Sequence, residues 1–226
     1  MTASRSFPCS LSPPAWITLT AFAVALAWDA SGLDLPLARL AGSAAGFPAR
    51  DSWWLSEVLH EGARRLSWLL ALGVCLGVWW PFGPLRRLPA ARRLQLAAST
   101  LAAAMVVALL KAGSATSCPW DLAAFGGAAR YVSHWSGLPD GGSGRCFPAG
   151  HASSAFSFIG GYFAFRPSDA SVSRAWLLAA AGGGLVLGLA QQWRGAHFMS
   201  HTLWSGVVCW CTAYAADLAW PRRGAA

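Results

Sequence analysis

Charged residues are scarce in this sequence. Only 12% of the 226 residues are Asp, Glu, Lys or Arg, whereas soluble domains usually contain about 25%. Apolar residues make up 55% of the chain. A surface this poor in charge is poorly suited to water, so the composition favours a protein that is solvated by lipid.

Lysine is almost absent, because Lys111 is the only one in the chain. The net charge is nevertheless +8, and arginines supply the rest of the positive charge. They occur in short clusters between apolar runs, which is typical of a polytopic membrane protein. We therefore expect membrane lipids, and no nucleic acid, as partners. Lys111 ends an apolar run, where an ionisable group is a candidate functional residue.

The sequence also lacks internal repeats, low-complexity tracts and a separate soluble domain, so we expect one domain over residues 1–226. Six apolar runs predict an all-α membrane bundle of about six transmembrane helices. The runs cover residues 15–33, 66–82, 94–111, 151–165, 175–192 and 198–220. The first run follows an arginine and contains Ala25-Leu26-Ala27, so a cleavable signal peptide is the alternative there.

Charge predicts the orientation of these spans. With six spans, several arginines fall on one side, which the positive-inside rule assigns to the cytoplasm. These are Arg5, Arg86, Arg87, Arg92, Arg93, Arg166, Arg174, Arg222 and Arg223. Most acidic residues fall on the other side. The loops at 34–65, 112–150 and 193–197 are therefore expected to face outward.

Three polar stretches stand out on this outer side, at residues 111–120, 145–154 and 194–201. They contain basic residues and three of the five histidines, which suits an anionic substrate. Phosphoryl transfer is the chemistry that they favour, because Lys111 and Arg194 can stabilise phosphoryl oxygens. One histidine can attack phosphorus, and a second can protonate the leaving alkoxide.

Together the three stretches resemble the signature of the type-2 phosphatidic acid phosphatases, which include lipid phosphatases, some soluble acid phosphatases and vanadium haloperoxidases. The family motifs are K-x6-R-P, P-S-G-H and S-R-x5-H-x3-D, and the resemblance covers about residues 105–210. It implies a metal-independent hydrolase without a cofactor, which acts on a lipid phosphate or diphosphate through a phosphohistidine intermediate. The expected location is the bacterial inner membrane, with the active site facing the periplasm.

The resemblance also implies residue roles. Lys111 matches the lysine of the first motif and would bind phosphate. Gly150 and His151 match the second motif, in which the histidine would be the general acid and the glycine would let the backbone approach the phosphate. His197 matches the histidine of the third motif and would be the nucleophile.

Four positions depart from the family pattern. Cys118 stands in place of Arg, Ala149 in place of Ser, and His201 in place of Asp. The arginine of the third motif should lie at Gln191, but the available arginine is Arg194. On a helix these two positions differ by only ~4.5 Å along the axis, a distance that an arginine side chain can cover.

The change at His201 is the most serious, because an acid there would stabilise the cationic form of the nucleophile. Neutral His201, four residues after His197, can instead accept a hydrogen bond from it. Asp121 is another acid that could help. A shifted alignment makes His201 the nucleophile and Ser205 its partner.

Two cysteines flank the motifs on the predicted oxidising side. Cys118 follows the first motif and Cys146 precedes the core of the second, so we hypothesise a disulfide that ties the two motifs together. Arg145 could then replace the phosphate contact that is lost at Cys118. Cys75, Cys209 and Cys211 lie in apolar runs and are interpreted as small hydrophobic residues.

The remaining histidines, His60 and His134, match no motif and are interpreted as surface or interfacial residues. His197 and His201 have the spacing of two zinc ligands on a helix. No glutamate lies between them and no third ligand is evident, so we expect no metal site.

Two other functions remain compatible with the sequence. The first is a phosphotransferase that moves the phosphoryl group from a lipid such as undecaprenyl diphosphate to an acceptor such as lipid A, because the same residues would serve. The second is a membrane protein that binds or moves an anion or lipid without chemistry, which the departures at Cys118 and His201 keep open. The sequence predicts neither the lipid nor the oligomeric state.

Overall fold

Helices supply all of the regular secondary structure in the computed structural model, which describes residues 11–221. No β-strand occurs in this range, so the all-α prediction is confirmed. In chain order the elements are α1 (Pro13–Ser31), α2 (Asp34–Ala38), η1 (Trp54–Gly62), α3 (Ala63–Leu76), η2 (Gly83–Arg87), α4 (Ala90–Ala112), η3 (Pro119–Asp121), η4 (Ala123–Phe125), α5 (Gly150–Phe156), η5 (Ser157–Ile159), α6 (Gly160–Phe165), α7 (Ala170–Trp193) and α8 (Met199–Ala219).

Each of the six predicted apolar runs contains a long helical segment, but the second has different bounds from those predicted. The sequence placed it at residues 66–82, whereas the helix starts with the π-helical η1 at Trp54 and ends with α3 at Leu76. Polar and charged residues between Glu57 and Arg65 interrupt the apolar pattern. The part of the helical segment before Leu66 was therefore not recognised. A glycine and two nearby prolines follow Leu76, and these residues favour a turn over a helix.

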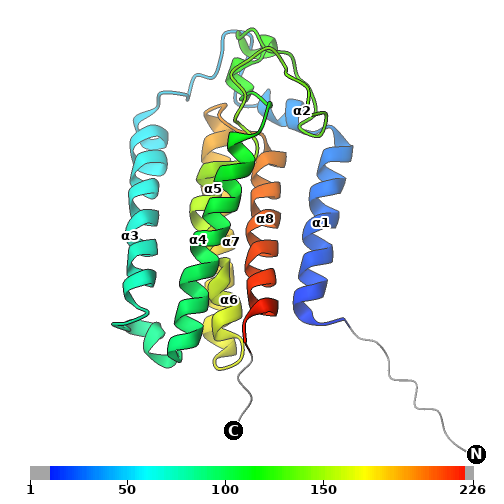
Figure 1. Ribbon diagram of the computed structural model, residues 1–226. Helices are drawn as coiled ribbons and strands as arrows, with labels where there is room; N and C mark the ends of the chain where they lie inside the picture. The colour runs from blue at the N-terminus through cyan, green and yellow to red at the C-terminus, as the bar shows by residue number, and fades with distance from the viewer. Residues whose placement is uncertain (1–10, 222–226) are drawn as a thin grey trace, which may run out of the picture.

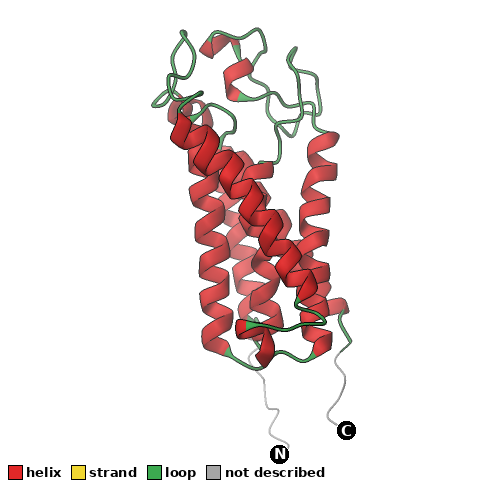
Figure 2. Ribbon diagram, turned by 90° about the vertical axis from the view of Figure 1, so that its left-hand side faces the viewer, coloured by secondary structure: helices red, strands yellow, loops and turns green. Residues whose placement is uncertain are grey.

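The helices run roughly side by side (Figure 1). Helices α4, α5, α7 and α8 pack together at the centre, α1 packs against α8, and α3 packs against α4 and α5. Seen from the α3 side, this helix crosses the bundle obliquely (Figure 2). The polar loops that carry the three motifs gather at one end of the bundle, called the motif end here, together with α2, η3 and η4.

Small residues allow α7 to approach its neighbours closely. A methyl group on Gly184 would overlap the ring of Phe156 in α5, and one on Gly188 would overlap Thr202 in α8. Close approach of this kind is the usual way in which helices pack when lipid surrounds them. Both contacts lie within a few turns of the motif end, so they fix the distance between the helices that carry the second and third motifs.

Charge is distributed less simply than the sequence predicted. The acids do concentrate at the motif end, and only Asp169 and Asp217 lie at the opposite end, paired with Arg87 and Arg92 at 2.8 and 3.1 Å. Basic residues occur at both ends, however, and Arg39 is among those at the motif end. The arginines therefore do not fix the orientation by themselves.

Within the described residues, two helices are long and apolar enough to cross a membrane by length and composition, namely α4 and α7. The other four segments are shorter, less apolar or divided between several elements. Association with a membrane rests on these two helices.

Candidate active site

The first and second motifs meet where α4 ends and α5 begins. Lys111 lies in the last turn of α4, and its side chain passes over Gly150, the first residue of α5. A Cβ atom at Gly150 would lie 3.5 Å from Cδ of Lys111. The lysine stem is thus in ordinary van der Waals range of the start of α5, beside His151.

A disulfide holds these two motifs together. Cys118 and Cys146 are joined, with their Cα atoms 5.2 Å apart, which confirms the pairing hypothesised from the sequence. Beside the bond, the backbone N–H of Cys146 donates to the carbonyl of Thr116 at 2.9 Å. The N–H of Arg145 donates to the carbonyl of Ser114 at 2.8 Å. Two segments of the loop, at residues 114–116 and 145–146, are therefore fixed next to the end of α4.

His197 lies between α7 and α8 and has only 3% of its surface exposed. Burial lowers its pKa well below the usual 6.5, and the nearby charges of Lys111, His201 and His151 lower it further, while the backbone of Cys146 acts in the opposite sense. The imidazole is therefore neutral at physiological pH. A neutral imidazole has a free lone pair, which is the form that a nucleophile needs.

The structure does not form the hydrogen bond that was expected between His197 and His201. Their ring centroids lie 5.7 Å apart at an angle of 66°, and Nδ1 of each ring has no partner among the described residues. The suggested help from Asp121 is also absent, because its carboxylate accepts from the N–H of Cys118 at 3.3 Å and from the Ser143 hydroxyl at 3.0 Å. The carboxylate of Asp121 therefore stabilises the turn at η3, beside the disulfide.

Ser205, the partner in the shifted alignment, is occupied elsewhere. Its hydroxyl donates to the backbone carbonyls of Ala149 and His201, at 3.0 and 2.8 Å. The His201 ring instead packs edge-on against Phe147 and Phe198. These contacts give His201 a packing role beneath the second motif.

The guanidinium of Arg194 lies beside Gln191, the position at which the family motif has its arginine. Its Nη1 lies 3.3 Å from Oε1 of Gln191, and its Nε donates to the carbonyl of Arg50 at 2.8 Å. It also lies close enough to His151 to act on it electrostatically. Arg145, by contrast, is exposed and has a left-handed backbone, with φ of 60°. Its role in phosphate binding stays a prediction.

Sequence reasoning missed His60, which is not a simple surface residue. Its ring lies face to face with that of His151, with the centroids 3.7 Å apart and the planes at 29°. Its Nδ1 lies 3.1 Å from a carboxylate oxygen of Glu61. π-Helical turns such as η1 often occur at functional sites, but the irregularity leaves no mark in the sequence.

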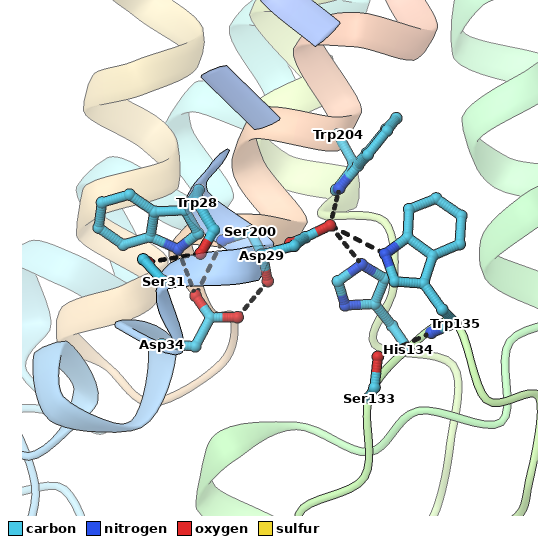
Figure 3. Close-up of polar contacts among 9 residues, drawn as sticks. All are labelled: Trp28, Asp29, Ser31, Asp34, Ser133, His134, Trp135, Ser200 and Trp204. Atoms are coloured by element: carbon cyan, nitrogen blue, oxygen red, sulfur yellow. Dashed lines mark hydrogen bonds and ion pairs between the residues drawn. The ribbon is translucent and has the colours of Figure 1, made fainter. Parts of the chain in front are cut away.

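His134 was also misinterpreted, because only 8% of its side chain is exposed. Its ring stacks on Phe147, directly before the second motif, with the centroids 4.2 Å apart. Its Nε2 lies 3.4 Å from a carboxylate oxygen of Asp29 in α1 (Figure 3). That same oxygen accepts the indole N–H groups of Trp135 and Trp204, both at 2.8 Å.

A second acid, Asp34, fixes the start of α8 (Figure 3). Its carboxylate accepts the backbone N–H of Ser200 at 3.1 Å, the Ser200 hydroxyl, and the indole N–H of Trp28 at 2.8 Å. Ser200 lies between His197 and His201 in the sequence. The first two helices, which carry no motif, thus hold the third motif in place.

No group of three or more His, Cys, Asp or Glu residues within 11–221 is arranged to hold a metal ion. The groups that do converge are a lysine, an arginine and histidines, which phosphoryl transfer can use as charge donors, nucleophile and acid. The fold and the site together therefore define a helical protein in which basic and histidine side chains gather at one end of the bundle.

The comparison with protein families agrees. The family described as the PAP2 superfamily matches residues 92–224, which is more than half of the chain, and the protein belongs to this superfamily. Its members are phosphatases, so membership supports an enzyme with phosphatase or phosphotransferase activity on phosphate esters. No curated protein and no solved structure shows significant similarity to this chain.

Proposed function

We propose that the protein is a membrane phosphatase that removes the terminal phosphate of a lipid phosphate or diphosphate. The observation that carries this proposal is an apolar cavity of about 830 Å³ between α3, α5 and α7. It begins beside Ala63 and Ser154, each three residues beyond a histidine of the stacked pair, and extends toward Phe82 at the opposite end of the bundle. A cavity with this lining and volume suits a hydrocarbon chain.

The outer surface of the bundle supports six membrane-spanning segments. Large apolar side chains are exposed on α1, α3, α4 and α7, more than half of each surface in several cases. Examples are Trp16, Trp68, Leu69, Met105, Leu109, Leu178 and Val186. Such a belt is unfavourable in water and favourable in lipid. It extends over α1 and α3, which do not qualify as spans by length and composition together.

The disulfide supports an active site on the periplasmic side of a bacterial inner membrane. Disulfides persist in oxidising compartments and are rare in the cytosol. The bond between Cys118 and Cys146 lies at the motif end, beside the second motif. An orientation that placed this end outside would let the bond form and would place the site near the lipid headgroups.

In the proposed reaction, Nε2 of His197 attacks the terminal phosphorus while the bond from phosphorus to the leaving oxygen breaks. His151 takes up a proton as the anionic substrate binds beside it, and it gives this proton to that oxygen. Water then attacks the phosphohistidine, His151 takes up a proton again, and orthophosphate leaves. Lys111 and Arg194 stabilise the charge on the phosphoryl oxygens.

The experiment is phosphate release from a panel of lipids in detergent, with EDTA present. The panel contains phosphatidic acid, phosphatidylglycerol phosphate and undecaprenyl diphosphate. We expect release that persists in EDTA, is lost in His197→Ala and is retained in Arg130→Ala, a matched control because Arg130 is exposed in the same loop system. Appearance of the phosphate on added lipid A, with no release of orthophosphate, would identify a phosphotransferase. Neither release nor transfer would overturn the proposal in favour of a binding protein.

A further inference from the structure

His60 lies outside the three motifs and outside the part of the chain that matches the superfamily. It is nevertheless in direct contact with His151, because the two rings stack with centroids 3.7 Å apart. Face-to-face stacking leaves the edges of both rings free, so the nitrogens of His60 do not bond to His151. The stacking therefore does not account for the hydrogen-bonding capacity of the His60 nitrogens.

Glu61 determines which edge of His60 is available. Its carboxylate lies 3.1 Å from Nδ1 of His60 and also accepts from Arg64 at 2.7 Å. A carboxylate at Nδ1 holds a proton on that nitrogen and stabilises the ring when it carries a charge. Nε2, on the opposite edge, can then donate to an anion. A histidine held by a carboxylate on one edge is suited to bind phosphate with the other.

The cavity places this donor on the lipid side of the reacting phosphorus. The cavity starts at Ala63, less than one turn after His60, and at Ser154, about one turn after His151. A lipid chain held in the cavity therefore has its end nearest to the stacked pair on the side of Ala63 and Ser154. The part of the substrate beside His60 is then the group that links the chain to the terminal phosphate.

The identity of that linking group depends on the substrate. In a lipid monophosphate it is an uncharged ester oxygen, whereas in a lipid diphosphate it is a second, negatively charged phosphate. Arg194 lies near both His60 and His151, so the surroundings of the pair are rich in positive charge. A hydrogen-bond donor beside the positive charge of Arg194 contributes most if the linking group carries negative charge.

We propose that His60 binds the inner phosphate of a lipid diphosphate and makes the enzyme selective for diphosphates over monophosphates. The inference rests on the proposed function. In the reaction, the bond between the bridging oxygen and the terminal phosphorus breaks as the His197–phosphorus bond forms. The bridging oxygen takes the proton of His151, and the lipid monophosphate departs. His60 stabilises the negative charge of this leaving group.

The test compares farnesyl diphosphate with farnesyl monophosphate, which share one hydrocarbon chain, on the full-length protein in detergent. His60→Phe keeps an aromatic ring on His151 and removes the donor, whereas His60→Gln keeps a donor and removes the ring. For His60→Phe we expect kcat/KM for the diphosphate to fall about tenfold to hundredfold, the effect of one charge-assisted hydrogen bond, with a change of less than about threefold for the monophosphate. His60→Gln should retain part of the preference.

Binding supplies a second measurement that does not depend on turnover. In the His197→Ala background, the further change His60→Phe should weaken the binding of farnesyl diphosphate and leave that of the monophosphate unchanged. Equal losses for both lipids, or no loss for either, would overturn the role of His60 while leaving the phosphatase intact. Absence of phosphate release from the two farnesyl lipids and from every lipid of the panel above would instead overturn the proposed function, and this inference with it.

Discussion

The guanidinium of Arg194 turns back along α7 and lies 3.3 Å from the side-chain oxygen of Gln191. The family motif has its arginine at the position of Gln191, so this contact brings a guanidinium next to that position from a residue three places later in the sequence. A helix end makes this possible, since Arg194 is the C-cap of α7 and its side chain is free to fold over the last turn.

The displaced arginine leads to the first prediction. Arg194→Gln should lower kcat/KM by ~10²–10³, the usual effect of removing one group that stabilises transition-state charge. Arg194→Lys should recover only part of the loss, because lysine cannot bind two oxygens as a planar fork. Steady-state kinetics on the best lipid of the panel measures both. An effect no larger than that of the control Arg130→Ala would show that Arg194 does not bind the phosphoryl group.

The buried position of His197 makes a prediction about pH. Since burial lowers its pKa well below 6.5, the nucleophile stays unprotonated as the pH falls through 6.5. The acid limb of the kcat/KM profile that belongs to His197 should therefore lie below pH 6.5. The pH dependence of kcat/KM for the wild-type enzyme, measured between about pH 4 and 8, locates this acid limb, because histidines titrate in that range. An acid limb at or above 6.5 would contradict the burial that we describe.

The disulfide can be tested independently of activity. Its cysteines are 28 residues apart, and closure of a loop of this length stabilises a protein by about 3–4 kcal/mol. Cys118→Ser or reduction should lower the temperature of unfolding, whereas Cys75→Ser should not, because Cys75 is unpaired in α3. Alkylation of the unreduced protein should label neither Cys118 nor Cys146. Labelling of both in protein isolated from the membrane would show that the bond is not formed.

Asp34 provides a prediction about residues that position the site. Asp34→Ala leaves the Ser200 N–H and hydroxyl and the Trp28 indole without their acceptor, in a buried place. Unsatisfied buried donors cost about 1–3 kcal/mol each, so the variant should be clearly less stable. It should also lose turnover, because Ser200 neighbours His201 and is three residues from His197. Asp51→Ala, which removes an exposed acid at the same end, should leave thermal unfolding unchanged.

The sequence predicted the parts of the fold that hydrophobicity determines. Apolar runs identified the six helical segments. They misplaced both ends of the second, whose start was hidden by charged residues between Glu57 and Arg65 and which ends at Leu76. The motifs likewise identified Lys111, His151 and His197, because their spacing is local. The superfamily match covers these residues but does not test their individual roles.

The contacts that the sequence did not predict join residues that are far apart in the chain. His60 meets His151 across 91 positions, and Asp34 meets Ser200 across 166. Neither pair forms a motif, since each depends on how α3 and α1 pack against the central helices. That the side chain of Arg194 can reach Gln191 was predictable, because the regular geometry of one helix relates the two positions.

The bond between Cys118 and Cys146 is a second covalent link between the two halves of the bundle, besides the chain that runs from one cysteine to the other. Gly137 and Leu138 are exposed within this loop. If a protease cut the chain there, the fragment with α1 to α4 and the fragment with α5 to α8 would stay covalently joined beside Lys111. The helical bundle could thus exist as two chains that share one active site, and this loop is the place to insert a tag or to divide the protein for separate labelling of its halves.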